Sequence, residues 1–138
     1  MYMFKKMVGL LTVVGFLLTA CSGQGTANKG EVNITLTDFG IISSTTEFTV
    51  GTPYRFTVTN NGLVEHEFMI MPPLKENSMG MGMDMGALDE MALAVIAASD
   101  LQPGDTASFD YTFTEPAAAG ELEFACHTPG HYEANMKL

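Results

Sequence analysis

The residues best suited to bind a metal lie close to the end of the chain. Cys126, His131 and Met136 follow one another at intervals of five residues. Between them, Pro129 and Gly130 form a turn signal, which can bring His131 back beside Cys126. Thiolate, imidazole and thioether groups are all ligands for transition metals. The spacing therefore indicates a loop that folds around one ion.

A second imidazole, that of His66, lies far upstream. His66 shares its sequence parity with Phe68 and Ile70, so in a strand the three side chains project to one buried face. Cys126 continues in the same way a row that contains Phe124. The two potential ligands therefore lie at the ends of inward-facing rows.

Together, His66, Cys126, His131 and Met136 offer the ligand set of a blue copper site, with two histidines and a cysteine in a plane and a weak axial methionine. The soft thiolate and thioether suit Cu(I), and the imidazoles suit both oxidation states. Other interpretations stay open at this point. They are a zinc site, a buried cysteine with unrelated histidines, and a cysteine–histidine nucleophile pair with His127, although neighbours in a strand point to opposite faces.

The elements that must position these residues are short strands. Apolar and polar residues alternate in five runs, at 32–37, 54–59, 66–70, 107–114 and 122–126. Turn signals rich in Gly, Pro and Asn lie between several of them, at 51–53, 60–62 and 103–105. Helical segments do not alternate with these runs, so the sequence predicts an all-β sandwich of five or six strands.

Residues 72–99 interrupt the β pattern, and we expect them to form an insertion between strands. The first part alternates methionine with Gly or Asp, and its methionines are Met79, Met81, Met83 and Met85. This run is either adaptable filler or a loop that binds additional Cu(I), because thioethers are soft ligands that survive in an oxidising compartment. Met69 and Met71, on the outer face of their strand, would extend such a surface. Residues 87–98 are predicted to be a short helix, with Asp89 and Glu90 in its first turn.

The first twenty residues have the pattern of a secretory signal. Lys5 and Lys6 precede an uncharged apolar stretch, residues 7–20, which is short for a membrane span of about 20 residues. The sequence Leu-Thr-Ala-Cys that ends at Cys21 resembles the lipobox of bacterial lipoproteins. The resemblance implies cleavage before Cys21 and a diacylglycerol on its sulfur. Residues 21–30 would then be a flexible tether to a bacterial membrane, and 31–138 an extracytoplasmic domain; an uncleaved anchor is the alternative.

Composition and charge limit the classes of partner. The chain has 138 residues, which suits one domain, and a formal net charge of −10. An acidic chain lacks the basic face that nucleic-acid binding requires, so a nucleic-acid partner is not expected. If Cys21 carries lipid, Cys126 is the one thiol left, because the chain has two cysteines. In an oxidising compartment, that thiol must be buried and inert, paired between chains, or bound to a metal.

The ligand pattern resembles that of the cupredoxins, the single-domain blue copper proteins such as plastocyanin, azurin and auracyanin. The resemblance covers about residues 31–136 and rests on Asn-Gly-Leu-Val-Glu-His at 61–66 and on Cys-x₄-His-x₄-Met at 126–136. It implies a Greek-key β-sandwich and one-electron transfer. It also implies that His66, Cys126 and His131 are equatorial copper ligands and that Met136 is the axial one.

The sequence departs from the family pattern in two places. Members often carry Asn after the first histidine ligand and Ser or Thr after the cysteine, and these residues tie the ligand loops together. Here the two positions are Glu67 and His127. We expect a charge-assisted hydrogen bond between them, with a raised pKa for His127. Cupredoxins also continue past the methionine into a final strand, so we expect either that the sandwich lacks this edge or that the sequence is truncated.

Two functions follow from this interpretation. In the first, the protein is a lipid-anchored electron carrier with one type 1 copper and a redox protein as its partner. In the second, it handles copper for resistance, buffering or delivery, and the methionine run binds additional Cu(I) for a copper-handling partner. Neither function makes the chain an enzyme. A sandwich for adhesion or scaffolding, without a metal, is a more distant alternative.

Overall fold

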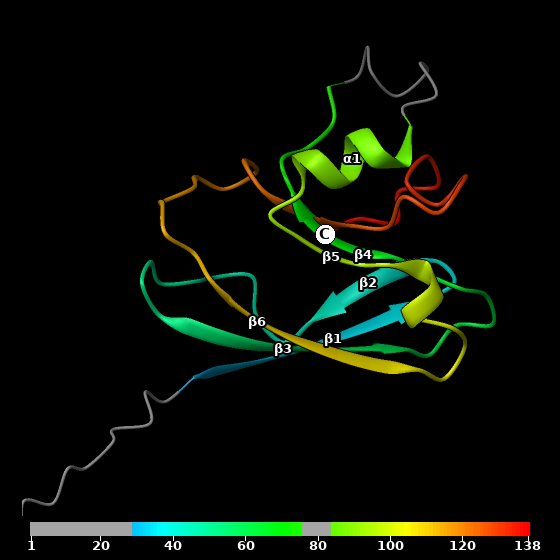
Figure 1. Ribbon diagram of the computed structural model, residues 1–138, viewed down its shortest axis with the longest axis horizontal. Helices are drawn as coiled ribbons and strands as arrows, with labels where there is room; N and C mark the ends of the chain where they lie inside the picture. The colour runs from blue at the N-terminus through cyan, green and yellow to red at the C-terminus, as the bar shows by residue number, and fades with distance from the viewer. Residues whose placement is uncertain (1–28, 76–83) are drawn as a thin grey trace, which may run out of the picture.

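The computed structural model describes residues 29–75 and 84–138, which fold into two β-sheets that face each other (Figure 1). The first sheet has four strands in the order β2-β1-β3-β6. Its strands are β1 (Gly30–Thr37), β2 (Gly40–Ser43), β3 (Pro53–Asn60) and β6 (Thr106–Thr112). The pair β1–β3 is parallel, and the other pairs in this sheet are antiparallel.

The second sheet has three antiparallel strands in the order β5-β4-β7. Its strands are β4 (Phe68–Met71), β5 (Ala94–Ile96) and β7 (Glu123–Ala125). The alternation in the sequence thus predicted the strands that carry the ligands, and the expected all-β sandwich is confirmed. The short strands β2 and β5 were not predicted.

The core between the sheets comes from the inward-facing parity of each strand. Val32, Ile34 and Leu36 of β1 are buried, as are Phe56 and Val58 of β3. Phe68, Ile70, Phe124 and Cys126 pack against them from the second sheet. Full burial of one such large apolar side chain stabilises the fold by about 1.5–3 kcal/mol. Cys126 therefore belongs to the core that holds the two sheets together.

The segment expected to be a helix over 87–98 is divided between two elements. Helix α1 spans Met85–Met91, so the prediction was wrong at both ends, and neither Asp89 nor Glu90 lies in its first turn. The chain becomes extended at Ala92. It then forms β5, in which Ile96 pairs with Phe68 of β4. Pairing with an open sheet edge, together with the β-branched residues at 95 and 96, outweighs the helical propensity of the alanines.

Helix α1 covers the outer face of β4. Both faces of this strand are buried, and Met69 and Met71 pack with Leu88 of the helix, Ala125 and Tyr132. The expectation that Met69 and Met71 extend a methionine-rich surface is therefore wrong. Met79, Met81 and Met83 lie outside the described residues, and Met85 is a partly exposed residue at the start of α1.

The last residues pair with β7. Phe124 and Leu138 exchange two backbone hydrogen bonds of 2.9 Å, and Lys137 forms an antiparallel bridge with Ala125. Among residues 29–75 and 84–138, no helix is long and apolar enough to cross a membrane.

Candidate metal centre

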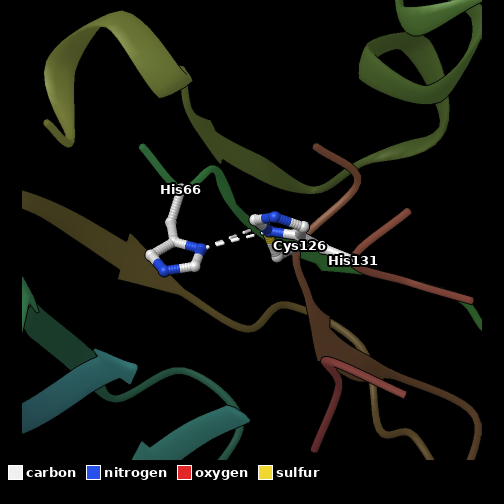
Figure 2. Close-up of side chains that lie close together, drawn as sticks. All are labelled: His66, Cys126 and His131. Carbon is white, nitrogen blue, oxygen red and sulfur yellow. Dashed lines mark hydrogen bonds between the residues drawn. The ribbon is translucent and has the colours of Figure 1, made fainter. Parts of the chain in front are cut away.

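Three side chains that are far apart in the sequence converge at one point, and each presents one donor atom (Figure 2). The Nδ1 atoms of His66 and His131 are 3.2 Å apart. The Sγ atom of Cys126 lies 3.4 Å from Nδ1 of His131 and 3.9 Å from Nδ1 of His66. His66 and Cys126 are fully buried, whereas His131 is partly exposed. The structure thus brings together three of the four residues that the sequence singled out as metal ligands.

The spacing of the three donors fits a single transition-metal ion. Bonds of about 2.0 Å to nitrogen and 2.3 Å to sulfur, arranged in a plane, leave the donors roughly 3.5–3.8 Å apart. The observed edges of the triangle, 3.2, 3.4 and 3.9 Å, are close to that size. Burial, and then the neighbouring His131, lower the pKa of His66. This shift favours the neutral imidazole, which is the form that binds a metal.

The start of β4 and the end of β7 bring His66 and Cys126 together. The two strands are antiparallel neighbours, so His66, two residues before β4, and Cys126, the residue after β7, lie at the same end of the sheet. The Glu67 backbone N–H donates a hydrogen bond to Cys126 Sγ over 3.4 Å. Thr128 Oγ1 also lies 3.4 Å from this sulfur. The sulfur of Cys126 thus contacts both the segment before β4 and the loop that follows β7.

A buried asparagine, Asn60, fixes the loop that carries His66. Its Nδ2 donates hydrogen bonds of 2.8 Å to the carbonyls of Val64 and Leu101, and its Oδ1 accepts one from Gly62. The backbone N–H of His66 donates to the carbonyl of Leu101. A role for Asn60 was not predicted from the sequence. The available signal was a polar residue that continues the inward-facing row of β3.

The loop between Cys126 and Met136 closes through backbone hydrogen bonds. The N–H of His131 donates to Thr128, and the N–H of Met136 donates to His131, both over 2.9 Å. Cys126 in turn donates to the carbonyl of Met136. Gly130 has a φ of 86°, a conformation that glycine adopts without strain. The predicted Pro-Gly turn therefore forms and brings His131 to the cysteine.

Met136 is buried in the same core cluster as Cys126. Its backbone is hydrogen-bonded to two of the three converging residues. Its role as axial ligand stays a prediction.

The expected tie between Glu67 and His127 does not form. Both side chains are buried, but among the hydrogen bonds of residues 29–75 and 84–138 none joins them. Burial, and then Asp89, raise the pKa of Glu67 to about 7, and the nearby backbone of His127 opposes this rise. Burial lowers the pKa of His127, so the expected increase was wrong in direction. The His127 ring instead stacks on Tyr132, with centroids 4.2 Å apart.

Comparison with curated proteins finds two similar copper proteins. The copper-resistant cuproprotein CopI of Rubrivivax gelatinosus is 35% identical over 88 residues, which cover 62% of this chain and 49% of that protein. The copper-resistant cuproprotein CopI of Pseudomonas aeruginosa is 26% identical over 140 residues, covering 82% of this chain and 76% of that protein. The match thus spans about half the length of the first relative. No protein-family model matches the chain.

Solved structures with the same arrangement of strands include two auracyanins. Reduced auracyanin from Roseiflexus castenholzii has a TM-score of 0.56 at 20% identity and covers 80% of this chain and 94% of its own. Auracyanin B has a TM-score of 0.57 at 21% identity, with 78% and 84% covered. These likenesses, together with the two facing sheets, show that the chain has the cupredoxin fold, and His66, Cys126 and His131 form a group in it that could hold one metal ion.

Proposed function

We propose that the protein binds one type 1 copper and transfers single electrons outside the cytoplasm. The observation that carries this proposal is the convergence of His66, Cys126 and His131 at a buried point in a cupredoxin fold. Bound copper would supply the Cu(II)/Cu(I) couple. Met136, which is buried beside the group, would be the weak axial ligand that separates this ligand set from that of a zinc site.

The chain itself restrains the ligands. His66 and Cys126 are fully buried, which excludes water from two sides of the centre. The Glu67 N–H donates to Cys126 Sγ, and the His66 N–H donates to the carbonyl of Leu101, so His66 and Cys126 can keep one geometry in both oxidation states. His131 is the partly exposed member of the group, and electrons would pass through its ring to a redox partner. We propose that Cys21 anchors the protein to a membrane, where such partners lie.

A second function is favoured by the relatives, both of which are named copper-resistant cuproproteins. In that case the protein would handle copper, and Met79, Met81, Met83 and Met85 would provide additional Cu(I) binding. Electron transfer would then be incidental. The two functions share the type 1 centre and differ in how much copper the protein holds.

Copper stoichiometry and redox cycling test the proposal together. A carrier is expected to bind one copper tightly and to be reduced and reoxidised repeatedly without loss of metal. A copper-handling protein is expected to bind additional Cu(I), and that excess should disappear when the four methionines at 79, 81, 83 and 85 are changed to serine. Met69→Leu is the matched control, because Met69 is fully buried under α1. A protein that releases its copper at each reduction would contradict the carrier function.

A further inference from the structure

The side of His66 that faces away from the donor group lies beside a carboxylate. Nδ1 of His66 faces Cys126 and His131, and Nε2 points away from both of them (Figure 2). Asp38 Oδ1 is 3.7 Å from this Nε2. The ring is fully buried, and Nε2 has no other polar partner among the described residues. A buried N–H without an acceptor is costly, so this carboxylate is the available partner.

The position of Asp38 is fixed by two loops. Asp38 lies in the turn between β1 and β2, where Thr37 and Gly40 pair. Its Oδ1 accepts a hydrogen bond of 2.6 Å from the backbone N–H of Leu63, in the loop that carries His66. A carboxylate oxygen can accept two hydrogen bonds, so this contact leaves room for the imidazole. The hydrogen bond from Leu63 thus holds the Asp38 carboxylate beside Nε2 of His66.

Gly62 makes this approach sterically feasible. A Cβ atom at this position would lie 2.7 Å from His66 Nε2 and still closer to Asp38 Oδ1. Such distances are too short for carbon beside nitrogen or oxygen, so any side chain here would separate the two groups. The backbone N–H of Gly62 is itself held by Asn60 Oδ1 over 2.8 Å. The space between the carboxylate and the imidazole therefore depends on a glycine in a fixed loop.

We propose that Asp38 is a positioning residue for the metal ligand His66. Its carboxylate accepts the Nε2–H, which fixes the tautomer whose Nδ1 lone pair faces the centre. The 3.7 Å between Asp38 Oδ1 and His66 Nε2 is an ion-pair distance, and the proposed hydrogen bond requires the two atoms to approach further. The negative charge makes the imidazole a stronger donor and favours Cu(II) over Cu(I). The effect on the copper potential rests on the proposed function, whereas the choice of tautomer does not.

Two substitutions separate positioning from loop anchoring. Asp38→Asn keeps the shape and an acceptor oxygen for Leu63 but removes the charge. Asp38→Ala removes both. Loss of an outer partner of a metal-bound histidine lowers metal affinity by roughly 10–100-fold. We expect the affinity for Cu(II) to fall more than the affinity for Cu(I). Each tenfold decrease in the ratio of these two affinities raises the reduction potential by about 59 mV. Asp110→Asn is the control, because it removes one carboxylate from the strand β6, where Asp110 pairs with Lys29 and Arg55.

The first measurement is the potential of the copper-loaded protein and these three variants, with the blue absorption recorded for each. We expect a higher potential for Asp38→Asn, a higher one still for Asp38→Ala, and an unchanged one for Asp110→Asn. Potentials that match the control in both Asp38 variants would overturn the proposal. If the wild-type protein shows no blue absorption, the proposed function fails instead.

The second measurement uses the metal-free protein and does not depend on copper. Nitrogen-15 NMR at a pH where His66 is neutral reports which ring nitrogen carries the proton. We expect the proton on Nε2 in the wild-type protein and in Asp38→Asn, and a mixture of tautomers in Asp38→Ala. A proton on Nδ1 of the wild-type ring would contradict the proposal. Thermal unfolding of the variants shows whether each is folded. If Asp38→Ala does not fold, the reduction potential of Asp38→Asn still tests the proposal.

Discussion

The chemistry of the centre depends on which nitrogen each imidazole presents. His66 and His131 both direct Nδ1 at Cys126 Sγ, at 3.9 and 3.4 Å. The other nitrogen of His66, Nε2, is buried beside Asp38. The sequence could predict these ligands because their types, spacing and inward parity are local features. It could not predict Asp38, because the contact with His66 joins a hairpin turn to a distant loop and appears only when the strands pair.

Met136 provides a test of the axial position. Met136→Leu conserves volume, so we expect it to cost less than about 1.5 kcal/mol in stability. Loss of the thioether removes a weak donor, which should favour Cu(I) and raise the reduction potential while the blue absorption persists. Voltammetry of the copper-loaded variant beside the wild-type protein measures this. An unchanged potential would show that Met136 is a core residue rather than a ligand.

Short strands end at the ligands, and the loops that follow them are fixed by side chains. Asn60, the last residue of β3, connects the loop of His66 to Leu101. Helix α1 covers β4 from the outside and buries Met69 and Met71. The hydrogen bonds of Asn60 and the packing of α1 stabilise β4 and the loop before it. We therefore expect a substitution that removes either one to lower the stability of the protein.

Asn60→Ala should weaken the loop that carries His66. The change removes donors to two carbonyls, Val64 and Leu101, and an unsatisfied buried group costs about 1–3 kcal/mol. We expect the metal-free protein to lose roughly 2–4 kcal/mol in free energy of unfolding, measured with urea. Asn61→Ala, at the exposed neighbouring position, is the control. A loss that equals that of the control would show that the loop does not depend on Asn60.

Met71→Ala tests whether α1 buries the outer face of β4. Met71 is fully buried, and truncation of a buried methionine costs about 2–5 kcal/mol because it leaves a cavity. Met85→Ala, at the partly exposed start of α1, should change stability by less than about 0.5 kcal/mol. Urea unfolding of both variants measures the difference. Equal effects would mean that the helix does not cover this strand.

A comparison of the two sheets shows which strands can be predicted from sequence patterns alone. Strands β1 and β3 have one buried face, and β6 has one partly buried face, so their alternation is visible in the sequence. Strand β5 has only three residues and an alanine-rich context, and it exists because β4 offers an edge to pair with. Both faces of β4 are buried, so its outer methionines were wrongly assigned to the surface. The expected Glu67–His127 bond failed because the fold directs the two buried groups elsewhere.

The central claim is that Cys126 binds copper together with His66 and His131. The most direct measurement is the visible absorption spectrum of the purified protein after addition of Cu(II), beside the Cys126→Ser variant. We predict an intense blue thiolate-to-copper band at one copper per chain that is absent from the variant. A serine of similar size keeps the fold but provides no thiolate, so the comparison isolates the sulfur ligand. A colourless wild-type protein, or a band that survives in Cys126→Ser, would contradict the type 1 centre.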